Sequence, residues 1–358
     1  MQNTAPPRAS RAIVSVLALS GACLAATGAM AQDNVAAFYK DKTITIIVGS
    51  TPGGGYDTYA RLLSRHIGKH LPGSPKAVVQ NMPGAGSNRA AGYVADVAPK
   101  DGTMIAAVYS GQPLGRVLLE RSKLSYDPAK LNYLGSASQD TYVCLVRKDA
   151  PVKKYTDVFK NELVLGSSSP NASTGYMGIL QRNVLGAKIK LVVGYRGSRQ
   201  IFAAIEKGET QGVCGINWTS IQSTYKRFID SGLAHVLVQE DEKGVAEANK
   251  AGIPRTFDHA KTDEAKKILR TIYLQGRFAR PYFVAGGVPA ERVSALRKAF
   301  LDSWNDKALQ AEAAKMRLDI EPLSGDELQK LVLGISKEPD SFMDKVKDAI
   351  KYNLATGK

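Results

Sequence analysis

The sequence of 358 residues contains few of the residues that build metal clusters and disulfide frameworks. It has 3 cysteines and 4 histidines, which is too few for several zinc sites or for a scaffold rich in disulfides. Aromatic residues make up only 7% of the chain. No apolar run reaches the roughly 18–20 residues that a membrane-spanning helix needs. These absences argue against a protein with several zinc sites, a disulfide-rich scaffold and a membrane-spanning protein.

The residues that are present favour a folded chain with a substantial core. Hydrophobic residues make up 44% of the sequence and charged residues 23%, a balance unlike that of disordered chains. The length fits two domains or one large domain.

The first 31 residues have the pattern of a secretory signal peptide. They contain no acid, and Arg8 and Arg11 precede an apolar stretch, Ala12–Ala26. The small residues of Ala29-Met30-Ala31 follow, as expected at a cleavage site. We therefore expect export to the periplasm with cleavage near Ala31.

The cysteines leave two questions open. Cys23 is the basis of an alternative lipoprotein signal, although Ser20 stands where that signal needs an aliphatic residue. Cys144 and Cys214 lie in strand-like runs and would meet an oxidising compartment after export. They either form a disulfide, if their strands are neighbours, or pack as two buried thiols.

The chain is basic, with a formal net charge of +15. Its lysines and arginines are scattered, without a dense run or interleaved aromatics, so a nucleic acid is not the expected partner. The charge either serves solubility or raises the local concentration of small anions.

Short apolar runs alternate with helical periodicity, which predicts an α/β fold with parallel strands covered by helices. The expected strands are 44–49, 77–80, 104–109, 141–147, 163–167, 191–195, 211–215, 234–239 and 282–285. The expected helices are 58–71, 89–97, 174–185, 199–207, 289–304, 307–316, 325–333 and 338–352, with Ser324 as an N-cap. We expect two α/β domains with a ligand cleft between them, because no flexible linker separates two halves of the chain.

The loop Gly49–Asp57 is the sharpest local feature. A strand ends there, three consecutive glycines follow, and a helix begins. Such a turn directs several backbone N–H groups to one point at the positive end of a helix, where an anion binds well. An ordinary turn that merely needs glycine is the alternative. The loop matches neither the dinucleotide-binding pattern G-x-G-x-x-G nor a P-loop, so we expect no cofactor. Asp57 is expected mainly to cap the helix and shape the loop.

Three more polar loops precede predicted helices: 84–88, 167–175 and 195–198. Loops that follow parallel strands share one edge of a sheet, and their N–H groups and hydroxyls suit a carboxylate. The candidate ligand-binding residues are Ser50, Thr51, Gly53, Gly54, Gly55, Tyr56, Asp57, Ser87, Asn88, Ser168, Ser169, Ser173, Thr174, Tyr195, Arg196, Gly197 and Ser198.

Several ordered motifs resemble the Bug family, the periplasmic substrate-binding proteins of tripartite tricarboxylate transporters. The similar segments are Ile47–Asp57, Ala60–Leu62, Asn81–Asn88, Ala98–Thr103, Val193–Gly197, Pro289–Val293 and Ala313–Glu321. The resemblance covers essentially the whole mature chain.

This resemblance implies a two-lobed periplasmic binding protein fold, type II-like, which closes on a small organic carboxylate. It implies that loops 50–57 and 167–174 hold the ligand and that 195–198 lies nearby. We expect lobe 1 to comprise residues 33–140 and 276–358, and lobe 2 residues 141–275. The segment from about Arg255 to Gln275 is longer than is usual in the family. The implied partners are membrane permease subunits, and the protein is expected to be a monomer.

We expect no metal site and no catalytic residue. His66 and His70 have the spacing of metal ligands on a helix, but no third ligand is indicated, so a solvated helix face is favoured. No nucleophile elbow is present, and Ser168 and Ser169 lack a nearby candidate base. The expected function is therefore binding for transport. The alternatives are a ligand-presenting partner of a membrane receptor kinase and, less favoured, a hydrolase or transferase on the same fold.

Overall fold

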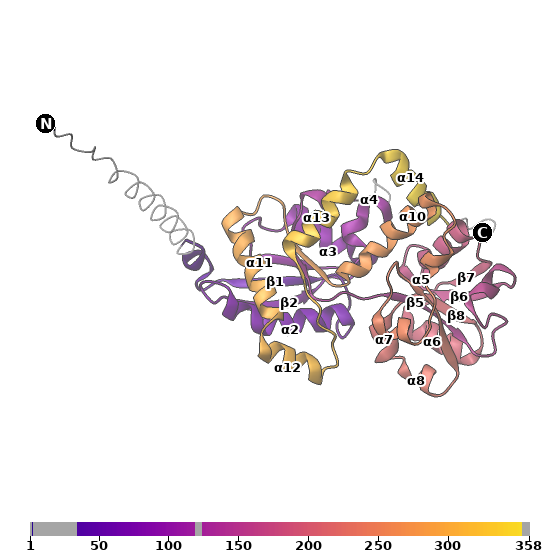
Figure 1. The fold of residues 1–358 in the computed structure, drawn as a ribbon. Coiled ribbons are helices and arrows are strands. Elements are labelled where there is room, and N and C mark those ends of the chain that lie inside the picture. The colour runs from indigo at the N-terminus through magenta and orange to yellow at the C-terminus, as the bar shows by residue number, and fades with distance from the viewer. Residues whose placement is uncertain (1, 3–33, 119–123, 353–358) are drawn as a thin grey trace.

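The computed structural model describes residue 2, residues 34–118 and residues 124–352. The chain forms two lobes, each built on a β-sheet with helices packed against it (Figure 1). The predicted signal peptide and Cys23 lie outside the described residues, except for residue 2, and remain a prediction. In the described part of the chain, every helix is too short or too polar to cross a membrane.

The first lobe contains a six-stranded sheet in the order β11–β4–β10–β3–β1–β2. Its strands are β1 (Thr43–Val48), β2 (Lys76–Asn81), β3 (Met104–Ala107), β4 (Asn132–Ser136), β10 (Pro281–Val284) and β11 (Leu323–Ser324). Successive residues of β1 face opposite sides: Ile46 packs in one apolar cluster and Ile47 in another. Both faces are thus covered, which explains why β1 is an almost continuous apolar run.

The second lobe contains a five-stranded sheet in the order β7–β6–β8–β5–β9. Its strands are β5 (Tyr142–Arg147), β6 (Leu163–Ser167), β7 (Ile189–Val193), β8 (Gly212–Asn217) and β9 (Ala234–Glu240). The two-lobed α/β fold is as expected, but the expectation of parallel sheets is only partly right. β10 pairs antiparallel with β3 and β4, and β5 pairs antiparallel with β8 and β9. The chain enters β5 when it passes from the first lobe to the second, and it enters β10 when it returns.

The helices agree with the expected ones over most of their length, apart from several that were not expected. They are α2 (Gly55–His70), α3 (Asn88–Gly92), α4 (Gly115–Leu118), α5 (Ser173–Leu180), α6 (Ser198–Lys207), α7 (Trp218–Gln222), α8 (Lys226–Asp230), α9 (Ala246–Lys250), α10 (Asp263–Tyr273), α11 (Ala290–Trp304), α12 (Lys307–Lys315), α13 (Gly325–Ser336) and α14 (Asp340–Ala349). Ser324 caps α13 as expected, in a capping box with Glu327. Neither β4 nor α10 was expected from the sequence, and α10 occupies much of the segment from Arg255 to Gln275.

Two segments carry the chain between the lobes: 137–141, from β4 to β5, and 274–280, from α10 to β10. They are hydrogen-bonded to each other. The Asp140 N–H donates to the Gly276 carbonyl at 2.8 Å, and the Ala137 N–H donates to the Arg280 carbonyl at 3.0 Å. The C-terminal helix α14 runs back towards the second lobe (Figure 1), where Asn183 donates to the Ala349 carbonyl at 3.2 Å.

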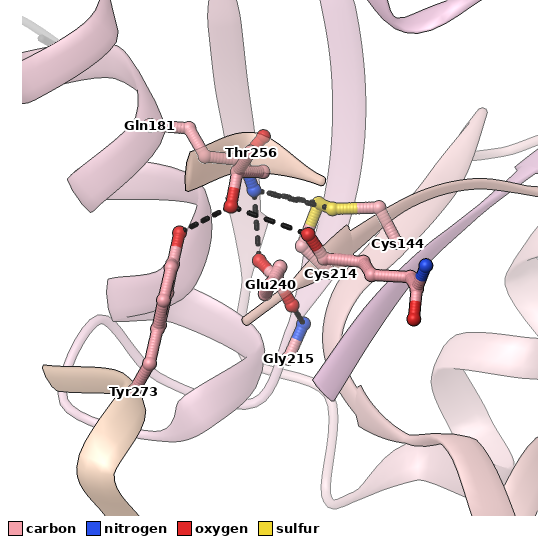
Figure 2. Close-up of a disulfide and its surroundings, with 8 residues drawn as sticks. Cys144, Gln181, Cys214, Gly215, Glu240, Thr256 and Tyr273 are labelled. Carbon is pink, nitrogen blue, oxygen red and sulfur yellow. Dashed lines mark hydrogen bonds between the residues drawn. A yellow bond between two sulfur atoms is a disulfide. The ribbon is translucent and has the colours of Figure 1, made fainter. Parts of the chain in front are cut away.

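The second lobe contains a disulfide between Cys144 of β5 and Cys214 of β8, which settles the question left open by the sequence. Figure 2 shows the groups around it. The buried Glu240 accepts hydrogen bonds from the Gln181 amide at 2.8 Å and from the Gly215 N–H at 2.7 Å. Burial raises the pKa of Glu240 to about 8, although these two hydrogen bonds act in the opposite direction.

The histidines of α2 do not lie on a solvated face, so that expectation was wrong. The helix α12 covers them. His66 contacts Glu312 at 3.0 Å, and His70 contacts Asp306 at 2.9 Å. Their spacing on α2 therefore serves helix packing within the first lobe.

Candidate ligand-binding site

The loop between β1 and α2 ends in a helix N-terminus that no side chain caps. The N-cap residue is Gly54, and the first backbone hydrogen bond of the helix is donated by the Thr58 N–H to the Gly54 carbonyl at 2.9 Å. The N–H groups of Gly55 and Tyr56 have no acceptor among the described residues. Two donors at the positive end of a 16-residue helix are thus available to an anion.

Asp57 is the third residue of α2 and not its N-cap, so the capping expectation was wrong in detail. Its side chain is nevertheless used inside the protein. It accepts hydrogen bonds from the Gly53 N–H, from Arg61 and from Asn81, each at 2.8 Å. Burial raises the pKa of Asp57, but these hydrogen bonds outweigh burial and hold the pKa below its usual value. The carboxylate therefore holds the glycine loop in shape.

The second glycine loop of the first lobe, residues 84–88, is hydrogen-bonded to the start of the first loop. The Ser87 hydroxyl donates to the Gly49 carbonyl at 3.0 Å and accepts from the Tyr109 N–H at 3.2 Å. Ser87 is fully buried, and Asn88, the first residue of α3, follows it. A Cβ on Gly49 would lie 2.1 Å from the Ser87 oxygen, which explains why glycine ends this strand.

The candidate loops of the second lobe also lie together. The Tyr195 N–H donates to the Ser167 carbonyl at 3.3 Å, which joins the two loops. Within them, the Thr174 hydroxyl accepts from the Ser168 N–H at 3.2 Å, and the Ser198 hydroxyl accepts from Tyr225 at 2.8 Å. Thr174 is buried. The other candidate residues of these loops are partly or fully exposed: Ser168, Ser169, Ser173, Tyr195, Arg196, Gly197 and Ser198.

Side chains from both lobes and from the crossing segments meet at what we call the interlobe cluster, formed by Tyr56, Ser110, Tyr142, Tyr176, Gln275 and Arg280. The Ser110 N–H donates to the Tyr56 hydroxyl at 3.2 Å, and the Ser110 and Tyr142 hydroxyls are 2.9 Å apart. Tyr176, in the first turn of α5, donates to the side-chain oxygen of Gln275 at 2.6 Å, and the Ser110 hydroxyl donates to the same oxygen at 3.5 Å. The N-terminal ends of α2 and α5 are thus linked through this cluster.

Arg280 is the charged member of the cluster. Its side chain lies over the rings of Tyr56 and Tyr59, with the guanidinium carbon 4.6 and 5.2 Å from the ring centroids. Arg280 is 9% exposed, and its Nε is buried without a hydrogen-bond partner. Within the described ranges its guanidinium makes one hydrogen bond, from Nη1 to the Ala279 carbonyl at 2.9 Å. A Cβ on Gly55 would lie 3.5 Å from Nη2, so the guanidinium borders the start of α2.

Five members of the interlobe cluster were not expected from the sequence to be site residues: Ser110, Tyr142, Tyr176, Gln275 and Arg280. One signal was available. Arg280 is a lone cation in the apolar run Phe278–Ala285. Burying an unpaired charge costs free energy, so an arginine in such a run indicates a function. The other four are ordinary core or loop residues in sequence, and only the packing of the two lobes brings them together.

The described residues offer no convincing metal site. The grouping that comes closest consists of Cys144, Cys214 and Glu240. Its two sulfur atoms are bonded to each other, whereas a metal ligand must be a thiolate.

One curated relative supports the family assignment over part of the chain. It is a UPF0065 protein of Agrobacterium vitis, from the TAR-I ttuE–ttuC′ intergenic region, and it is 31% identical over 176 residues. The alignment covers 47% of this chain and 48% of the relative, so it spans about half of each protein. No protein-family model matches the chain.

Solved structures match a much larger part of the fold. A TctC solute-binding protein from Polaromonas has a TM-score of 0.63 and 16% identity over 87% of this chain and 99% of its own. The periplasmic binding protein BugD has a TM-score of 0.63 and 18% identity over 87% and 98%. A Rhodopseudomonas palustris protein with adipate has a TM-score of 0.62 and 20% identity over 86% and 97%.

At these identities the structural likeness concerns the fold. The structures that carry it belong to solute-binding proteins and not to enzymes. The chain is a homologue of a UPF0065 protein with the two-lobed fold of TctC and BugD, which confirms the resemblance to the Bug family.

Proposed function

We propose that this protein is a periplasmic solute-binding protein that captures a small organic carboxylate between its lobes, residues 33–140 with 276–358 and residues 141–275. It delivers the ligand to the permease subunits of a tripartite tricarboxylate transporter. The adipate in one structural neighbour supports a carboxylate as the ligand class.

The observation that carries the proposal is the uncapped start of α2. Gly55 and Tyr56 present N–H groups that have no acceptor in the described part of the chain, and Asp57 holds their loop in place without occupying those donors. Charge-assisted hydrogen bonds to a carboxylate contribute roughly 1.5–3 kcal/mol each. About six to eight such bonds, from this helix start and from loops 167–174 and 195–198, would give roughly 9–24 kcal/mol before the costs of association. Micromolar affinity requires about 8 kcal/mol after those costs, which lies within this range.

A ligand screen tests this function directly. Protein freed of bound ligand by unfolding and refolding is mixed with adipate, malate, citrate, benzoate or phthalate, and its thermal unfolding and binding heat are measured. We expect at least one acid to bind and to raise the melting temperature, and to be recovered chemically unchanged. If none binds, the proposal is wrong; if the acid is converted, the protein is an enzyme.

A further inference from the structure

The guanidinium of Arg280 is a buried cation that forms no ion pair with an acid among the residues that the structure describes. Arginine keeps its charge at any ordinary pH and offers five N–H donors. Among the described residues this guanidinium makes one hydrogen bond, to the Ala279 carbonyl, and it lies over the rings of Tyr56 and Tyr59. Rings attract a cation but do not accept its N–H groups as well as oxygen does. A buried charge in this state is expensive unless an anion completes it.

Asp140 is the acid whose charge acts on Arg280, but its carboxylate accepts hydrogen bonds from another residue. Asp140 lies on the other crossing segment. No ion pair joins them within the described residues, because the Asp140 carboxylate accepts from the hydroxyl and the N–H of Thr219. Burial raises the pKa of Asp140 to about 6, which further weakens its claim as a permanent counter-ion.

The position of Arg280 points to a specific partner. Its Nη2 borders Gly55, whose N–H also lacks an acceptor, so an unpaired cation and unpaired helix donors lie at one place. A carboxylate has two oxygens with several lone pairs and can accept from a guanidinium and from backbone N–H groups together. An uncharged amide or ester would leave the cation unpaired.

We propose that Arg280 binds one carboxylate of the ligand together with the N–H groups of Gly55 and Tyr56, and so determines that only ionised acids are accepted. This proposal rests on the proposed function, because it assigns the residue that recognises the carboxylate. Arg280 also belongs to a crossing segment and contacts Tyr56, so its ligand lies where the lobes meet.

The test compares Arg280→Met with Arg277→Met. Arg277 is on the same crossing segment, but its guanidinium is exposed and donates to Gln139. Both variants and the unaltered protein are stripped of ligand, checked by circular dichroism, and titrated by calorimetry with adipate, malate, citrate, benzoate and phthalate. Each acid that binds is repeated as its amide.

We expect Arg280→Met to bind on the order of 100-fold more weakly, the loss of a charge-assisted hydrogen-bond pair, while Arg277→Met binds normally. Without ligand, Arg280→Met should melt no lower than Arg277→Met, since it removes an uncompensated buried charge. Arg280→Lys keeps the charge without the planar fork and should bind with intermediate strength, which covers a Met variant that fails to fold.

Two results would overturn the proposal, and they differ from each other. Unaltered affinity in Arg280→Met, or equal binding of acid and amide by the original protein, removes Arg280 from the site while leaving the proposed function intact. Binding of none of the acids by the original protein overturns the function together with the role of Arg280.

Discussion

Two buried ionisable groups, Glu240 inside the second lobe and Arg280 at the junction of the lobes, differ in how the protein satisfies their hydrogen bonds. Glu240 lies inside the second lobe, where Gly215 and Gln181 supply both of its hydrogen bonds. Arg280 lies at the junction, where its guanidinium donates one hydrogen bond and its buried Nε has no partner among the described residues.

The difference follows from what each group can do with its charge. A carboxyl group can bind a proton and become neutral, and burial favours that form of Glu240. An arginine cannot lose its proton, so its charge must be met by an anion or remain uncompensated. The hydrogen bonds of the Glu240 carboxyl group are therefore supplied by the protein itself, whereas the charge of Arg280 at the junction is not met within the described residues. Changes in the first region should alter stability, and changes in the second should alter binding.

The largest expected effect comes from removing the disulfide of the second lobe. Cys144 and Cys214 close a loop of sequence separation 70. Replacing both by alanine should lower the free energy of unfolding by about 2–5 kcal/mol, since the unfolded chain gains freedom. Urea unfolding measures this loss. Because neither cysteine belongs to the interlobe cluster or to the candidate ligand loops, carboxylate affinity measured on folded protein should be retained. Lost affinity would mean that stability and binding are not separated between the two regions.

The second effect concerns the dependence of stability on pH. The pKa of Glu240 is raised to about 8, so the unfolded chain releases this proton at a lower pH than the folded protein does. The contribution of Glu240 to stability is therefore present below the ordinary glutamate pKa and is lost as the pH rises to about 8. Each unit of the shift is worth about 1.4 kcal/mol. Urea unfolding from pH 5 to 8 should show this decline.

Glu240→Gln should flatten the decline, provided that the Gln181 amide turns to satisfy the new amide group. Glu242→Gln is the matched control. Its carboxylate pairs with Arg270, and this contact holds its pKa below the usual value despite opposition from partial burial. The control should keep the decline between pH 5 and 8. An equal slope in all three proteins would mean that Glu240 ionises normally.

A third prediction concerns the approach of the ligand to the α2 N-terminus. Gly54 has φ −80°, which a side chain tolerates, and a Cβ there would meet the Thr51 carbonyl at 3.5 Å, an ordinary contact. Gly54→Val should therefore fold with a loss of about 1 kcal/mol or less, as for a weaker N-cap, while abolishing carboxylate binding. Gly55→Ala should weaken binding less. Normal affinity of Gly54→Val, measured by calorimetry, would take this loop out of the site.

The smallest expected effect is a change of shape. The lobes are joined by the crossing segments 137–141 and 274–280, and a ligand that contacts both lobes should rotate them together. Small-angle scattering of stripped protein should show a smaller radius of gyration after a bound acid is added. An unchanged radius would indicate a fixed arrangement of the lobes, held by contacts such as those of Ser110 with Tyr142.

Local patterns predicted much of the fold. The strand Leu163–Ser167 was located to the residue, and the α2 region, Ser324 and α12 were recognised from periodicity and capping. The pattern did not reveal β4, a short strand that ends in Gly135-Ser136, nor the antiparallel neighbours of β10. Pairing between distant strands leaves no local signal, so sheet direction could not be derived.

The candidate site was only partly predictable, because some of its residues lie far apart in the sequence. Glycine loops before helices indicated the α2 N-terminus, since the backbone conformation of a turn depends on the residues in it. Arg280 was not found, since its importance depends on burial against Tyr56 and Tyr59, more than two hundred positions earlier in the chain. The roles of individual loop residues in binding remain predictions.

The most direct test of this account is a crystal structure of the protein with a bound acid from the ligand screen. We predict a carboxylate within hydrogen-bonding distance of the Arg280 guanidinium and of the Gly55 or Tyr56 N–H group. A ligand bound elsewhere, or Asp140 paired with Arg280 while the acid occupies another site, would contradict the central claim.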